Sequence, residues 1–152
     1  MKKLVIIAAL LMITSCYAYE VINMDSYIKE AQEHLTEESM ALEATIDARL
    51  PAMSKATFGK ITKHKIELTN FTYSIFIIGD DALSRQWLKE HTKELEEKNA
   101  LGFITNIESS SSLKALQELT NAPLIPANVD DLLALFKESH YPLIFHEGEI
   151  WQ

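Results

Sequence analysis

From residue 71 to residue 152, short apolar runs alternate with segments whose apolar residues have helical spacing. The runs predict strands, and the segments between them predict amphipathic helices. The expected strands are residues 73–78, 101–107, 124–125 and 143–145, and the expected helices are residues 83–97, 113–119 and 132–137. Strands that alternate with helices are typical of βαβ units, in which helices cover a mostly parallel sheet. The pattern therefore predicts an α/β fold.

Polar residues stand where each of these helices is expected to begin, as helix caps do. The expected caps are Asp80 or Asp81, the serines at 109–112, and Asn128 or Asp130. Asn99 and Gly102 lie near the end of the first helix, where such residues are common.

One side of the helix expected at 83–97 is apolar. It holds Leu83, Trp87, Leu88, His91 and Leu95. A helix that covers a sheet buries its apolar side, so we expect Trp87 to be a large anchor in the core.

Residues 25–49 contain no glycine or proline, and their apolar residues recur at helical spacing. One long helix is expected, with Asn23 or Asp25 as its cap and Pro51 marking its end. It is acidic, with one lysine, Lys29, against Asp25, Glu30, Glu33, Glu37, Glu38, Glu43 and Asp47.

A basic segment follows at residues 55–65, which we interpret as a loop with one or two short strands. Its lysines are Lys55, Lys60, Lys63 and Lys65, and Gly59 interrupts it. The opposite charges favour packing of the acidic helix on this segment. The alternative is that the helix docks on a partner.

The first 18 residues resemble an export signal. Lys2 and Lys3 precede an uninterrupted apolar run at residues 4–13, and small residues stand near a cut after Ala18. The run is too short to span a bilayer comfortably. We therefore expect residues 1–18 to be a signal peptide, residues 19–65 to form the helix and the basic connection, and residues 66–152 to form the α/β domain.

Cys16 is the only cysteine of the sequence. A cut after Ala18 would remove it and leave no disulfide chemistry in an oxidising compartment. Residues 13–16 also have the apolar-small-small-Cys order of a lipobox, in which the cysteine is acylated. The bulky Tyr17 favours the cut after Ala18, and membrane attachment is expected only if Cys16 is acylated.

The formal net charge is −8, and removal of the two signal lysines would make it about −10. Such a surface repels nucleic acid phosphates and anionic lipids. We therefore expect no nucleic acid partner, and a protein partner fits the charge better.

Two strings carry a resemblance to a known family. The first is the GDDxLSxxWL string at residues 79–88, and the second is Tyr141-Pro142-Leu143-Ile144-Phe145 with the terminal Gln152. On these strings, residues 66–152 resemble a family of small exported proteins encoded in integrating conjugative elements. The resemblance implies a periplasmic setting and a link to conjugative transfer by type IV secretion. It implies no reaction, because that family has no assigned activity.

The C-terminal part also looks like the second half of a thioredoxin-like fold. A helix is followed by Tyr141-Pro142, a strand, the two-residue turn Glu147-Gly148 and a returning strand, which favours a C-terminal β-hairpin. In that architecture the proline is cis and borders the active site. The Cys-x-x-Cys of redox thioredoxins is absent, and residues 79–82 stand at the matching corner. We expect a thioredoxin-like three-layer fold without thioredoxin activity.

The candidate interaction corner consists of Gly79, Asp80, Asp81, Ser84, Tyr141 and Pro142. Open α/β sheets bind ligands at the carboxyl ends of their strands, where the two aspartates are expected. Paired carboxylates there suit Mg²⁺ or an acid-base pair. The simpler interpretation is that one aspartate caps the helix and that the Ser84 hydroxyl bonds back to one of them.

The histidines, His34, His64, His91, His140 and His146, have neither a zinc-protease nor a zinc-finger spacing. We therefore predict no metal, no cofactor and no catalytic residue. The expected function is a non-enzymatic periplasmic accessory of an integrating conjugative element that contacts other envelope proteins of the conjugation apparatus. The alternatives are a metal-dependent hydrolase or other enzyme that uses Asp80 and Asp81, and a lipid-anchored structural component of the secretion channel.

Overall fold

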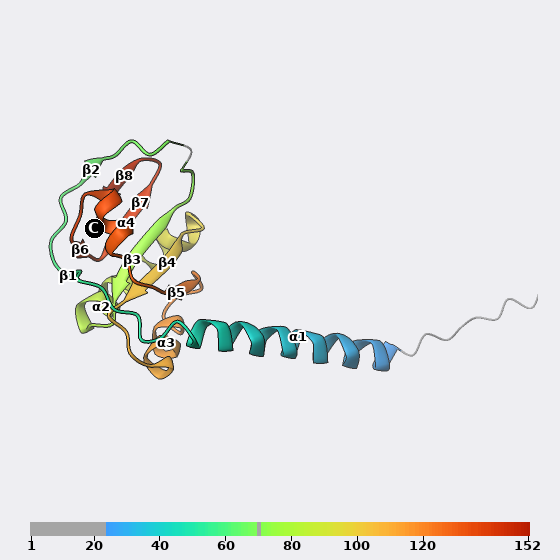
Figure 1. Ribbon diagram of the computed structural model, residues 1–152. Helices are drawn as coiled ribbons and strands as arrows, with labels where there is room; N and C mark the ends of the chain where they lie inside the picture. Colours follow the sequence, from blue (N-terminus) through green and yellow to red (C-terminus); the bar gives the residue numbers. More distant parts are fainter. Residues whose placement is uncertain (1–23, 70) are drawn as a thin grey trace, which may run out of the picture. The chain divides into compact units, whose positions relative to one another are not determined.

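The computed structural model describes residues 24–69 and 71–152 and has a mixed α/β architecture (Figure 1). The helices are α1 (Met24–Asp47), α2 (Ala82–Glu97), α3 (Ser110–Gln117) and α4 (Asp130–Phe136). The strands are β1 (Thr57–Phe58), β2 (His64–Lys65), β3 (Ile75–Gly79), β4 (Leu101–Thr105), β5 (Leu124–Pro126), β6 (His140–Tyr141), β7 (Leu143–His146) and β8 (Glu149–Trp151). The expected export segment, with Cys16, lies outside the described residues.

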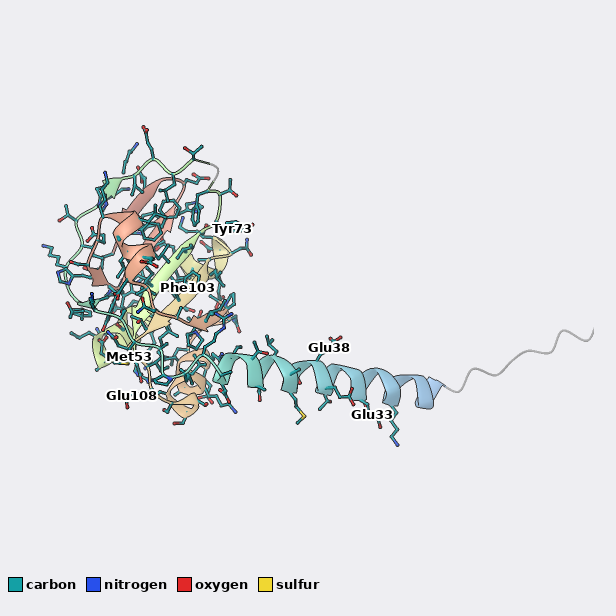
Figure 2. All side chains as sticks on the ribbon, viewed as in Figure 1. Glu33, Glu38, Met53, Tyr73, Phe103 and Glu108 are labelled. Atoms are coloured by element: carbon teal, nitrogen blue, oxygen red, sulfur yellow. The ribbon has the colours of Figure 1, made fainter. Side chains whose placement is uncertain are left out.

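α1 is the long acidic helix expected from the sequence. Its described side chains are exposed except for Ile46, and Glu33 and Glu38 stand among them (Figure 2). The chain divides into two compact units between Glu37 and Glu38, so the last part of α1 belongs to the unit that holds the sheet. No helix in the described part of the chain is both long and apolar enough to cross a membrane.

The main sheet has six strands in the order β2-β8-β7-β3-β4-β5. β3, β4 and β5 are parallel, and β3 and β4 run side by side (Figure 1). The pairs β3–β7, β7–β8 and β2–β8 are antiparallel. The expectation of a mostly parallel sheet is therefore wrong, because β7 returns to β3 in the opposite direction.

The predicted C-terminal hairpin is confirmed. β7 and β8 pair through the two-residue turn Glu147-Gly148. Both turn residues have positive φ angles, 48° at Glu147 and 80° at Gly148. This is the backbone of a tight hairpin turn whose twist matches that of the strands.

Each face of the sheet carries its own core, because the pleat sends successive side chains to opposite sides. Phe76 and Ile78 of β3 belong to the core that includes residues of α2 and α3. Ile75 and Ile77 of the same strand belong to the core that includes residues of α4. All residues of β3 are buried, which explains its continuous apolar sequence.

Most expected features of α2 are confirmed. Trp87 is 8% exposed, and Leu88 and Leu95 are fully buried. The expectation for Leu83 is wrong, because this residue is 54% exposed. Leu83 lies in the first turn of α2, next to the end of β3 at Gly79, and it is not a member of either core.

The cap predictions are confirmed for two of the three helices. Asp81 caps α2 and Ser109 caps α3. The cap of α4 is Val129, which offers no side-chain hydrogen bond. Asn128 instead accepts a hydrogen bond from the Asp130 backbone N–H at 2.9 Å, so it forms a turn before the helix.

The basic segment after α1 is part of the folded unit. β1 pairs with β6, and β2 is the edge strand next to β8. Lys63 and Lys65 pair with Glu149 of β8, at 2.8 Å and 3.5 Å. In residues 38–69, no ion pair joins a carboxylate of α1 to these lysines. The peptide bonds before Pro51 and Pro142 are cis, as the resemblance implied for Pro142.

Candidate functional site

The corner begins where β3 ends at Gly79. A Cβ atom at this position would lie 2.4 Å from the ring of Tyr141, so only glycine fits against that ring. The Gly79 N–H donates a hydrogen bond of 3.2 Å to the Ser84 hydroxyl. Gly79 and Tyr141 are 62 positions apart in the sequence, and they come into contact because glycine has no side chain.

Asp81 is bound to Ser84 through both of its carboxylate oxygens. The Ser84 N–H donates to Oδ1 at 2.8 Å, and the Ser84 hydroxyl donates to Oδ2 at 2.7 Å. Ser84 is fully buried. Asp81 therefore satisfies one free N–H of the first helical turn and also the buried hydroxyl, which confirms the interpretation of this pair as a cap.

Asp80 has a different partner. Its carboxylate accepts a hydrogen bond from the guanidinium of Arg85, one turn into α2, and forms an ion pair with it. The side chains are 15% and 29% exposed. The two neighbouring aspartates therefore serve separate partners and do not form one acidic pair.

Tyr141 and the half-buried Asn106 are joined by a hydrogen bond that the sequence did not reveal. Tyr141 is buried, and its hydroxyl accepts a hydrogen bond of 3.4 Å from Asn106. The Asn106 amide also donates to the Ala56 carbonyl at 2.8 Å and accepts from the Ser54 N–H at 2.9 Å. Asn106 has a φ of 53° directly after β4. An asparagine at a strand end was the available signal, since asparagine tolerates this backbone.

Beside this corner lies a groove of about 280 Å³, which we call the Trp87 groove. Its walls include Phe58 of β1, Leu83 and Trp87 of α2, and the buried Pro142. The Trp87 ring stacks on His91, with 4.4 Å between ring centroids. Pro142 thus connects the groove to the corner. The sequence pointed to Leu83, Trp87 and His91 as one side of a helix, but it did not predict that they line a groove.

A larger hollow, of about 820 Å³, lies along β2 and β8 and is polar. The ammonium groups of Lys63 and Lys98 stand 5.6 Å and 5.5 Å from the centroid of Trp151. The hydrogen bond from Lys63 lowers the pKa of Glu149 below its ordinary value. Its lysines are matched by an equal number of glutamates, so the hollow offers no unbalanced charge to a ligand.

The histidines within residues 38–69 and 71–152 have local partners. The hydroxyl of Ser74 is 2.7 Å from Nδ1 of His146, and that of Thr57 is 3.1 Å from Nδ1 of His140. Within residues 24–69 and 71–152, no group of three or more His, Cys, Asp or Glu side chains could hold a metal ion.

His64 joins the edge strand β2 to the end of α4. Its ring nitrogens lie 2.9 Å from the Thr62 carbonyl oxygen and 3.3 Å from that of Phe136. The hydrogen bond to Thr62 raises the pKa of His64, burial opposes this, and the Phe136 carbonyl and the Glu138 carboxylate reinforce it. Only the protonated ring can donate to both carbonyls at once.

The protein is therefore a mixed α/β protein in which the polar side chains that follow β3 bind to α2. The chain belongs to the family described as "Protein of unknown function (DUF2859)", whose model matches residues 14–150. No curated protein and no solved structure matches it.

Proposed function

We propose that this protein is a non-enzymatic periplasmic accessory of an integrating conjugative element, and that it supports conjugative transfer by type IV secretion through contacts with other envelope proteins. The proposal that the protein is not an enzyme rests on one observation, which is that both aspartates of the corner already have partners within the protein. Asp81 is bound to Ser84, and Asp80 to Arg85. A metal or an acid-base mechanism would need at least one of these carboxylates to turn toward a ligand.

We further propose that the fold is thioredoxin-like. The support is the sheet order, in which the β3-α2-β4 unit is parallel and the β7–β8 hairpin joins the other side of β3 in antiparallel orientation. β5 extends this arrangement by a parallel strand beyond β4. At the start of α2, Gly79-Asp80-Asp81-Ala82 replaces a Cys-x-x-Cys, so this proposal includes no redox step.

The test is a transfer assay in a donor cell whose copy of the gene is deleted. Transfer frequency should fall and should return with the full chain but not with residues 19–152 alone, which lack the export segment. Normal transfer by the deletion strain would refute the proposal. Complementation by Cys16→Ser separates the soluble form from the lipid-anchored alternative, since only an anchored protein needs the acylated cysteine.

The contact part of the proposal needs a direct measurement. The tagged full chain, cross-linked in intact donor cells and purified from envelope extracts, should carry components of the conjugation apparatus. The same purification from cells that lack those components is the control.

A further inference from the structure

The indole N–H of Trp87 has no hydrogen-bond partner. In the described part of the chain it is the only buried side-chain nitrogen or oxygen without one. Buried polar groups are nearly always paired, and an unpaired one destabilises the structure that contains it. Each unpaired buried group therefore needs an explanation, and an acceptor from outside the described residues is one.

Trp87 lies in the wall of the Trp87 groove, which two exposed apolar side chains also line. Phe58 is 42% exposed and Leu83 is 54% exposed, and they come from β1 and from the first turn of α2. The buried Pro142 is a third apolar residue of the walls. Clustered exposed apolar side chains mark interaction sites more often than single ones do.

The size and charge of the groove limit the kinds of molecule that can bind in it. Its volume of about 280 Å³ is close to the lower limit of the range of about 300–1,000 Å³ that is usual for small-molecule and cofactor sites. It suits one or two side chains of a peptide. Glu90 is the only acidic residue of its walls, and no lysine or arginine lines it. A basic residue of a partner would therefore find a complementary charge.

The geometry points to the Trp87 groove as a docking site for an apolar peptide segment of a partner protein. The segment places a large apolar side chain between Phe58 and Leu83, a lysine or arginine near Glu90, and a main-chain carbonyl on the Trp87 indole nitrogen. This inference rests on the proposed function and gives the partner's chemistry. Because the nitrogen is covered in the free protein, neighbouring side chains must change rotamer on binding, as is common at interfaces.

The first experiment is a selection of peptides from a phage-displayed library of random sequences on the purified exported chain. Enriched peptides should combine a large apolar residue with a nearby lysine or arginine. Leu83→Ser should weaken an enriched synthetic peptide about three- to tenfold in fluorescence anisotropy, since about half of the leucine surface is available for burial. Leu135→Ser is the matched control. Leu135 is a helical leucine that is 48% exposed and does not line the groove, so this variant should bind as the wild type does.

The second experiment follows the indole N–H signals by NMR. The sequence has two tryptophans, and Trp151→Phe assigns the signal of Trp87. The same peptide should move the Trp87 signal downfield on saturation, and Trp87→Phe should bind it about three- to tenfold more weakly. The melting curve of Trp87→Phe shows whether this variant is folded, and Leu83→Ser supplies the test if it is not.

A library that yields no enriched sequence pattern would overturn the inference. So would equal binding by Leu83→Ser and Leu135→Ser, or an unmoved Trp87 signal at saturation. None of these results depends on transfer in cells. Loss of transfer on deletion together with a failed selection would therefore leave the proposed function in place and refute only the groove.

Discussion

Replacement of Asp81 by alanine tests the structural interpretation of the corner. The change removes the acceptor for the Ser84 N–H, which is a helix cap worth about 0.5–2 kcal/mol. It also leaves the fully buried Ser84 hydroxyl without its acceptor, which costs about 1–3 kcal/mol. Because these terms overlap, we expect a loss of about 2–4 kcal/mol in the free energy of unfolding.

The assay is urea unfolding followed by circular dichroism. Asp81→Asn keeps one carbonyl oxygen for the Ser84 N–H and should recover about 1 kcal/mol of the loss. Ser84→Ala removes the hydroxyl itself, so adding Asp81→Ala to it should cost less than Asp81→Ala alone, with a coupling of about 1–2 kcal/mol. If Asp81→Ala unfolds within about 0.5 kcal/mol of the wild type, the cap reasoning is wrong.

Three further predictions follow from the same structure. Trp87→Ala should lower the free energy of unfolding by about 3–5 kcal/mol in urea titrations, because it empties a large buried site, and an unchanged midpoint would show that Trp87 is not a core anchor. The raised pKa of His64 stabilises the fold below the unfolded value of 6.5, and this stability is lost as pH rises through the folded pKa. His64→Gln should therefore flatten the pH dependence of the urea midpoint above pH 6.5. A curve that keeps its slope would contradict this prediction. Asp80→Asn should leave conjugative transfer unchanged while it weakens the ion pair with Arg85, whereas loss of transfer by a stably folded variant would favour the metal-dependent enzyme.

Local patterns in the sequence predicted much of the fold. The cap at Asp81 and the turn at Glu147-Gly148 depend on residues within a few positions, and both are confirmed. The direction of β7 was not predictable in the same way, because a short apolar run looks the same in parallel and antiparallel pairing. β2 has only two residues, one of them a lysine, and its place at the sheet edge is set by β8.

The sequence predicted which residues belong to the candidate site, but not which partners their side chains contact. The sequence placed Gly79, Asp81 and Ser84 together because they are neighbours on the chain. It could not show that Tyr141 packs on Gly79, or that Asn106 holds Tyr141, because these contacts join separate strands. Long-range contacts of this kind are fixed by packing, which single-sequence periodicity does not encode.

The basic segment has a consequence for the order of folding. β1 pairs with β6 and β2 pairs with β8, and Thr57 and His140 are separated by 83 positions. Such distant pairings close large loops, and chains rich in them fold slowly. Until β2 arrives, the outer edge of β8 is unpaired and open to wrong association with another molecule. Lys63 and Lys65 then protect the finished sheet, since charged side chains at its new edge oppose the addition of a further strand.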